Sequence, residues 1–263
     1  MLYDDQATRF DERAGLPPDA AEAVAAALLD IAGEPRGETW LDVGAGTGVL
    51  GLPLLRRGVR YVGFDRSPAM LEVFREKLAR EKLDAGLHAA DGNQRWPVDD
   101  RRVGVVFSAR ALHHLDPAHV VAETRRVLQG SGGWLMAGQV RRPQDSVKAV
   151  MRRQMRRLLE AHGYEGRNHR AGVEAVFEQL ERAGGRRIAP RIAARWTGEH
   201  RPVDSLAAWE GKAGLAGLDV PSEVKASVLE ELRGWVRERY ADPRQPLPQE
   251  ESFEVAAISV AID

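Results

Sequence analysis

The chain contains no cysteine among its 263 residues. This absence excludes disulfide bonds, zinc sites built on thiolates and a cysteine nucleophile. A chain without disulfides is compatible with a reducing compartment, and we expect a cytoplasmic protein.

The sequence also lacks a charge of one dominant sign and any long hydrophobic run. The formal net charge is −1, so no overall basic excess attracts the chain to nucleic acid or to an acidic membrane. No run approaches 18 consecutive apolar residues, and we expect no membrane span. Residues 1–13 are charged, and we expect no targeting segment there. The length suits one large α/β domain or such a domain with a cap.

The most informative stretch that is present covers residues 40–50, with the sequence WLDVGAGTGVL. An apolar strand runs into glycines at alternate positions, Gly44, Gly46 and Gly48, and a helical pattern follows. Glycine lets backbone N–H groups approach a ligand that any Cβ would block. A dinucleotide site would require a third glycine or alanine at position 49, where this chain has Val49. We therefore expect a nucleotide-type pocket that binds NAD poorly.

Further motifs follow in a regular order. Residues 61–65 form an apolar strand that ends in Asp65, 19 positions after Gly46. Ser67 and Pro68 then have the order of a helix N-cap and first turn. The remaining segments are a third strand ending at Asp91, a fourth strand at 103–107 with the loop 108–116, and a helix end, glycine turn and fifth strand at 127–135.

Taken together over residues 37–140, these motifs resemble the class I S-adenosylmethionine (SAM)-dependent methyltransferases. The resemblance implies an α/β, Rossmann-like fold with a seven-stranded, mostly parallel sheet, helices on both faces and an antiparallel last strand. It implies SAM as cofactor, S-adenosylhomocysteine as product and a small-molecule acceptor, as in the ubiquinone and menaquinone methyltransferases. The single domain, 1–263, would comprise an N-terminal lid and helix (1–35), a SAM-binding core (36–143) and helical cap insertions (144–170 and 200–250).

The same resemblance implies roles for individual residues. Asp65 would accept hydrogen bonds from the ribose hydroxyls, a task that suits an acceptor-only carboxylate. Asp91 would contact the adenine amino group, and Asp42 would act through the SAM ammonium or the loop. The alternatives are a helix cap for Asp65, a turn cap for Asp91 and a core position for Met70. The full expected cofactor set is Asp42, Gly44, Ala45, Gly46, Asp65, Arg66, Met70, Ala90, Asp91, Gly92, Ser108 and Arg110.

His113 and His114 follow the fourth strand. Adjacent residues of an extended segment point to opposite sides, so we expect at most one of these imidazoles in the pocket. His113 is the candidate for a general base, which is needed only if the acceptor is a hydroxyl or a carbon acid. No partners stand at metal-ligand spacing, and we expect no metal site. The resemblance also implies an N-terminal lid, in which Tyr3, Arg9, Phe10 and Arg13 are candidates for contacts with the SAM carboxylate; the alternative is a solvated terminal helix.

The pattern outside the core predicts helices and two strands. We expect helices at 20–33, 144–163 and 171–183, and a helical region at 203–240 interrupted at 214–217 and restarted at 221–223. The strands are expected at 187–196 and 253–262, and the two insertions are expected to enclose the acceptor pocket together with residues 1–16.

One helix within the first insertion is strongly basic. Its cations, Lys148, Arg152, Arg153, Arg156 and Arg157, stand beside apolar residues at helical spacing, which is typical of a solvated face over a buried stripe. No aromatic residues interleave with the cations, so we expect no nucleic-acid partner, while an anionic small molecule remains an alternative. Three functions stay open: a small-molecule methyltransferase, an RNA methyltransferase, and a SAM-binding module without transfer activity. The sequence does not specify the oligomeric state.

Overall fold

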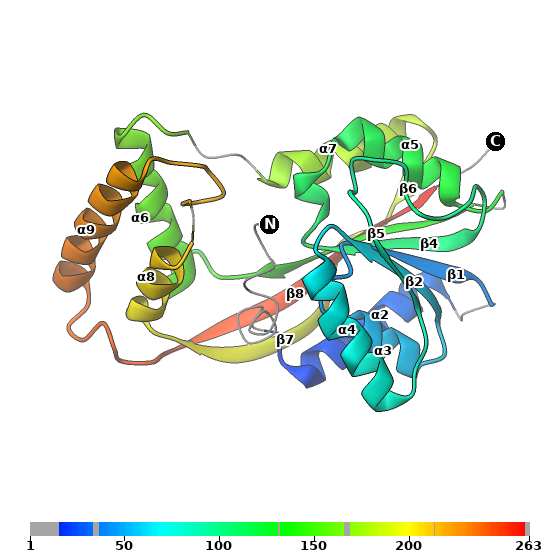
Figure 1. Cartoon of the computed structure of the whole chain (residues 1–263), viewed down its shortest axis with the longest axis horizontal. Coiled ribbons are helices and arrows are strands. Elements are labelled where there is room, and N and C mark those ends of the chain that lie inside the picture. The colour runs from blue at the N-terminus through cyan, green and yellow to red at the C-terminus, as the bar shows by residue number, and fades with distance from the viewer. Residues whose placement is uncertain (1–15, 34–36, 131, 166–168, 213, 261–263) are drawn as a thin grey trace. The chain divides into compact units, whose positions relative to one another are not determined.

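The computed structural model of the chain describes residues 16–33, 37–130, 132–165, 169–212 and 214–260 (Figure 1). The chain divides into two compact units. Unit 1 comprises residues 1–140, 169–195 and 253–263, and unit 2 comprises residues 141–168 and 196–252. The borders of unit 2 lie close to the two segments that the sequence analysis treats as insertions. That these segments enclose an acceptor pocket stays a prediction.

Unit 1 is built on a mostly parallel sheet with the strand order β3-β2-β1-β4-β5-β8-β6. The pairs β1–β2, β2–β3, β1–β4 and β4–β5 are parallel, whereas β6 and β8 pair antiparallel. The last strand lies beside the fifth, and the Rossmann-like α/β fold is confirmed. The strands are β1 (Thr39–Val43), β2 (Arg60–Asp65), β3 (Gly86–Ala89), β4 (Val103–Ala109), β5 (Gly133–Arg141), β6 (Arg186–Arg187), β7 (Arg191–His200) and β8 (Leu247–Val260).

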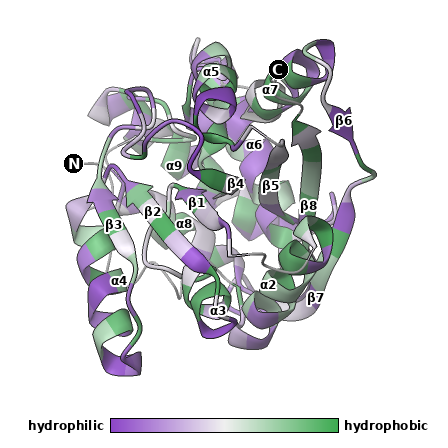
Figure 2. Ribbon diagram, turned by 90° about the vertical axis from the view of Figure 1, so that its right-hand side faces the viewer, coloured by the Kyte–Doolittle hydropathy of each residue, from purple (hydrophilic) through white to green (hydrophobic). Residues whose placement is uncertain are grey.

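Burial of the central strands explains their composition. The first six residues of β4 are all buried, and four of the five residues of β1 are buried. A parallel strand covered on both faces favours a continuous run of apolar residues over an alternating one. In Figure 2 the strands β5 and β8 are coloured largely as hydrophobic. Leu41, Phe64, Val106 and Leu135 belong to the resulting core.

Helices cover both faces of this sheet. In Figure 1, α5 and α7 lie on one face and α2, α3 and α4 on the other. Helix α4 starts where predicted, because the hydroxyl of Ser67 accepts a hydrogen bond from the Met70 amide at 3.3 Å and Pro68 occupies the first turn. The helices of unit 1 are α2 (Pro18–Ala32), α3 (Gly51–Arg56), α4 (Pro68–Glu81), α5 (Pro117–Val127) and α7 (His169–Arg182).

Two strand predictions need correction. The strand expected at 187–196 is split into β6 and β7, and Pro190, which has no amide hydrogen, lies in the break. This split raises the sheet from the expected seven strands to eight among the described residues. The last strand begins at Leu247, six residues earlier than position 253, and β7 pairs with it.

Unit 2 contains three described helices with a core of their own: α6 (Val147–Ala161), α8 (Pro202–Glu210) and α9 (Ser222–Arg239). The apolar stripe of the basic helix α6 is buried, which confirms the prediction of a buried stripe beneath its charged face. The core residues that α6 contributes are Val147, Met151, Met155 and Leu159, and they pack with Leu206 of α8 and with Val228, Leu232 and Val236 of α9. Among the helices that the structure describes in either unit, none has the length and hydropathy needed to cross a membrane.

Candidate cofactor site

The glycine loop after β1 adopts a conformation that ordinary residues avoid. Gly44, Gly46 and Gly48 have φ angles of +82°, +54° and +77°. A Cβ on Gly44 would lie 2.4 Å from the Cβ of Ala111, and a Cβ on Gly48 would lie 2.2 Å from the ring of Phe74. Among the described residues, a Cβ on Gly46 would meet nothing closer than 4.0 Å. Gly44 and Gly48 are therefore required by packing, whereas Gly46 keeps a space open.

Asp65 borders that open space. It ends β2, and its Oδ2 accepts the Gly46 amide at 2.9 Å while its Oδ1 accepts the Ser67 amide at 2.9 Å. An ionised carboxylate offers about four lone-pair positions, so Asp65 keeps acceptor capacity for a ligand. Desolvation raises the pKa of Asp65, although the hydrogen bonds from Ser67 and Gly46 oppose the shift. The N-cap of α4 is Ser67, not Asp65, which leaves Asp65 available for the predicted ribose contact.

Asp42 lies beneath the loop and is buried. Its Oδ2 accepts a hydrogen bond from the Tyr61 hydroxyl at 2.7 Å, whereas its Oδ1 is buried without a partner among the described residues. Desolvation raises the pKa of Asp42 to about 7, with a further contribution from the charge of Asp65 and an opposing one from Tyr61. Buried polar atoms normally have partners, so this oxygen is an exception within the site.

The loop after β3 returns to the same place. The Ala90 amide donates to the backbone oxygen of Asp65 at 3.0 Å, and the Asp91 carboxylate accepts the Asn93 amide at 3.0 Å. The Asp91 side chain therefore closes a turn, as the alternative interpretation expects, and still has free acceptor positions. Trp96 is buried against Phe64 and donates from Nε1 to the backbone oxygen of Gly92 at 3.0 Å.

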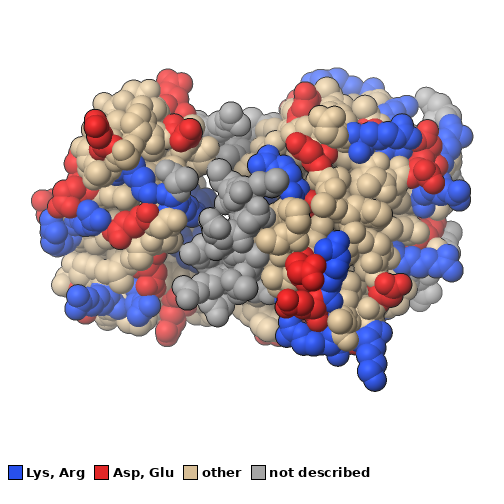
Figure 3. Space-filling model, viewed as in Figure 1, with Lys and Arg blue, Asp and Glu red and all other residues tan. Residues whose placement is uncertain are grey.

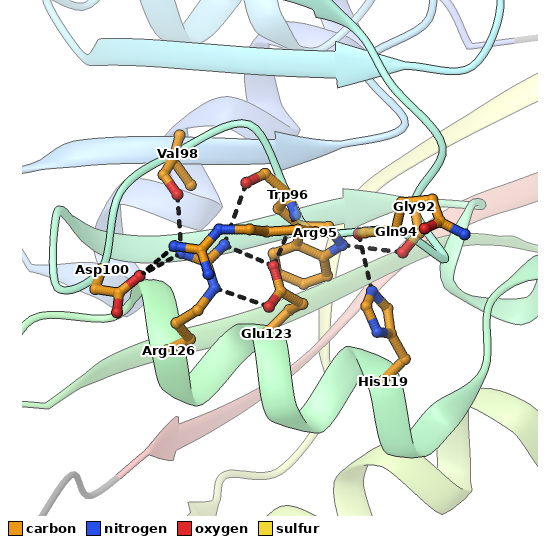
Figure 4. Close-up of polar contacts among 9 residues, drawn as sticks. All are labelled: Gly92, Gln94, Arg95, Trp96, Val98, Asp100, His119, Glu123 and Arg126. Carbon is orange, nitrogen blue, oxygen red and sulfur yellow. Dashed lines mark hydrogen bonds and ion pairs between the residues drawn. The ribbon is translucent and has the colours of Figure 1, made fainter.

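A buried ion pair on α5 holds this loop, and the sequence analysis did not identify it (Figure 4). Glu123 accepts the Trp96 amide at 2.7 Å and Nη2 of Arg126 at 2.6 Å. Arg126 also donates to the backbone oxygens of Trp96 and Val98 and to Asp100. Despite desolvation, the hydrogen bonds from Arg126 and Trp96 lower the pKa of Glu123. The i, i+3 spacing of Glu123 and Arg126 was the available sequence signal.

At the end of β4, Ser108 and Arg110 make hydrogen bonds to the backbone of neighbouring strands. The Ser108 hydroxyl is buried and donates to the backbone oxygen of Val43 at 2.7 Å, so it joins β4 to β1. Arg110 has a φ of +64° and donates its amide to the Gly138 oxygen at 3.1 Å. A residue other than glycine in this conformation is strained, which is common near binding sites. Met70 is buried in the core, as its alternative interpretation expects, and Arg66 is exposed.

His113 and His114 do not lie in an extended segment, and that expectation was wrong. They belong to a 3-10 helix, Leu112–His114, closed by hydrogen bonds from the His114 amide to Ala111 and from the Leu115 amide to Leu112. Their ring centroids are 3.9 Å apart, so the imidazoles pack against each other instead of pointing to opposite sides. The role of His113 as a base stays a prediction.

The remaining predictions concern the N-terminal candidate residues and the expected absence of a metal site. Tyr3, Arg9, Phe10 and Arg13 lie outside the described residues. Within the described ranges, no group of three or more His, Asp or Glu side chains is placed to hold a metal ion.

Comparison with known proteins bears on the glycine loop and the strands around it. Residues 41–132 match the protein family described as "Methyltransferase domain". The match covers about a third of the chain, and over that stretch the chain resembles a methyltransferase domain. An uncharacterized methyltransferase of Mycobacterium bovis is 39% identical over 92 residues, which are 35% of this chain and 36% of that protein. The chain thus matches only about a third of the length of this curated relative.

Solved structures share the fold of this chain at low identity. The YcgJ protein from Bacillus subtilis is 17% identical with a TM-score of 0.55, covering 91% of this chain and 98% of that one. The [4+2]-cyclase SpnF is 16% identical with a TM-score of 0.54, covering 92% and 81%. At these identities the comparison concerns the fold alone.

Proposed function

We propose that this protein is a SAM-dependent methyltransferase that acts on a small molecule. The observation that carries the proposal is the space at Gly46 that the described residues leave open. It is bordered by the Asp65 carboxylate, and the strand that leads into the loop carries the unpartnered oxygen of buried Asp42. Two carboxylates with free acceptor positions suit a ligand that presents ribose hydroxyls and an ammonium group. The methyltransferase domain over residues 41–132 supports the same assignment.

Each site residue has a defined task in this proposal. Bound SAM supplies a methyl group activated by its sulfonium. Asp65 holds the ribose, Asp42 holds the ammonium and Asp91 contacts the adenine amino group. The in-line displacement disperses charge, so the protein contributes chiefly by aligning donor and acceptor and by excluding water. A hydroxyl or carbon-acid acceptor would also require a base, for which His113 is the candidate.

The absence of certain residues from the chain excludes some classes of methyl acceptor. The loop after β4 reads Ser108-Ala109-Arg110-Ala111, unlike the N-P-P-[YF] loop of enzymes that methylate the amino groups of DNA adenine and protein glutamine. Without cysteine, the covalent route to base C5 methylation is closed. We therefore place the protein with the small-molecule group typified by ubiquinone and menaquinone methyltransferases.

Two other functions remain as alternatives. An RNA methyltransferase would use the basic helix α6, but Figure 3 shows acidic and basic side chains interspersed on the visible face of each unit, and not one continuous basic surface. A SAM-binding protein without transfer activity is the second alternative. SpnF, which has the same fold, is described as a [4+2]-cyclase.

One experiment separates these functions. The purified protein is incubated with SAM labelled on the methyl group and either a metabolite extract or extracted RNA. We expect label in the metabolite fraction and none in RNA. Label in RNA alone would favour the RNA enzyme, and SAM binding without any transfer would favour the third function. Calorimetry with NAD is the control: saturable micromolar binding of NAD without binding of SAM would overturn the proposal.

A further inference from the structure

Unit 2 has a buried carboxylate, Glu251, at the centre of a positively charged cluster. Its side chain is 1% exposed, and it accepts hydrogen bonds from Nε of Arg142 at 2.5 Å and from Nε1 of Trp196 at 3.2 Å. Nε2 of His200 lies 3.1 Å from the same carboxylate, and Nζ of Lys148 lies 4.0 Å away. All five residues belong to unit 2. Because a carboxylate accepts only, His200 donates from Nε2.

The positive charge extends along α6 beyond the reach of Glu251. Lys148, Arg152 and Arg156 are spaced four residues apart, so they form one row on the helix, about 12 Å long. Like charges at this spacing destabilise a helix. Desolvation lowers the pKa of Arg152, and the charges of Arg142 and Arg156 lower it further. The Arg152 side chain nevertheless keeps access to solvent.

The neighbouring carboxylates do not neutralise this row. Asp204 acts on Lys148 electrostatically, but both of its oxygens are bonded to Arg201, at 2.8 and 2.9 Å. Nε of Arg156 is buried without a hydrogen-bond partner in the described part of the chain. Arg142 and Lys148 therefore share the buried Glu251 carboxylate, whereas Arg152 and Arg156 have no ion-pair partner among the described residues.

We propose that Lys148, Arg152 and Arg156 bind an oxyanion, a phosphate, diphosphate or carboxylate group carried by a small molecule. Guanidinium groups present paired donors that match the oxygens of such groups, and Lys148 adds a point charge. Glu251 is a positioning residue that holds Lys148 within the row and Arg142 beside it. The proposed site lies within unit 2 and does not depend on the proposed function. The short row and the lack of aromatic residues on α6 favour a small anion over a nucleic acid.

The test is calorimetry on the full chain without SAM, with inorganic diphosphate, inorganic phosphate and citrate as separate probes. We expect saturable binding of at least one probe, and the tightest probe distinguishes a phosphorylated from a carboxylated ligand. The double variant Arg152→Gln/Arg156→Gln should bind about tenfold more weakly or worse, because two charge-assisted contacts are lost. The matched control is Arg153→Gln/Arg157→Gln, which removes the same charge from exposed positions rotated by about 100° on the same helix.

Equal weakening in both double variants would show a non-specific charge effect and overturn the proposal. If the wild-type protein binds none of the three anions, the proposal is also overturned. It is likewise overturned if a short RNA binds far more tightly than the anions and this RNA binding is lost in the Arg152→Gln/Arg156→Gln variant. SAM affinity is measured in parallel and should be unchanged in both variants, whose circular dichroism reports folding. A protein that binds diphosphate but not SAM would refute the proposed function and leave the anion site standing.

Discussion

The Tyr61 hydroxyl donates a 2.7 Å hydrogen bond to one oxygen of Asp42, while the other oxygen is buried without a partner among the described residues. The pKa of Asp42 is raised from 3.8 to about 7, mainly by desolvation. Between these pH values the folded protein keeps a proton that the unfolded chain releases. This group therefore makes the free energy of unfolding fall as pH rises from about 4 to 7.

The variant Asp42→Asn keeps an acceptor for Tyr61 and has no such titration. We compare the free energy of unfolding of the variant with that of the wild type. The difference, variant minus wild type, should increase by about 2–3 kcal/mol between pH 5 and pH 8, at about 1.4 kcal/mol for each pH unit below the folded-state pKa. Urea unfolding at the two pH values measures this difference. Parallel pH dependence of the two proteins would mean that Asp42 is already ionised at pH 5.

Replacement of Asp65 should act on cofactor binding. Asp65→Ala removes two expected charge-assisted hydrogen bonds to the ribose, of roughly 1.5–3 kcal/mol each, so SAM affinity should fall about a hundredfold or more. Calorimetry provides the measurement. Asp84→Ala, at an exposed carboxylate between α4 and β3, is the control and should bind SAM normally. Undiminished SAM affinity in a folded Asp65→Ala protein would refute the ribose assignment.

Replacement of Gly46 should weaken SAM binding, whereas replacement of Gly48 in the same loop should lower stability. Gly46→Ala places a methyl group in open space and costs about 1–2 kcal/mol for its positive φ, so the protein should fold but bind SAM poorly. Gly48→Ala drives a Cβ into the Phe74 ring and should cost about 2–5 kcal/mol of stability. Thermal unfolding and SAM calorimetry on both variants check this contrast. Equal stability of the two would contradict the packing argument.

The Glu123–Arg126 pair should stabilise the loop that carries Asp91. Arg126→Met leaves a buried carboxylate without its cation, and we expect a loss of about 3 kcal/mol in the free energy of unfolding. The side chains of Arg126 and Glu123 are 14% and 10% exposed, whereas those of Arg95 and Asp100 are 67% and 62% exposed. Arg95→Met is therefore a control that should change little. Urea unfolding compares the two, and similar effects would refute a special role for the buried pair.

Some features of the site could be predicted from sequence because local chemistry determines them. The alternating glycines, the Ser67 cap and the buried stripe of α6 depend on backbone freedom, capping and periodicity, and all of these are readable along the chain. The 3-10 turn at His113 was not predicted, because it depends on the neighbouring elements that the segment meets. The split of the strand was also not predicted, although Pro190 is a local signal for it. Glu251 was missed because its partners, Arg142, Trp196 and His200, are 109, 55 and 51 residues away.

The strand β8 imposes an order on the folding of the chain during synthesis. In the described sheet β6 is joined to the other strands only through β8, which follows all of them in sequence. Residues 253–260, which lie between β5 and β6, leave the ribosome after the whole of unit 2. Until then β5 has an unpaired edge, and such an edge favours aggregation. A nascent chain stalled before residue 253 would therefore depend on chaperones, whatever the stability of the finished protein.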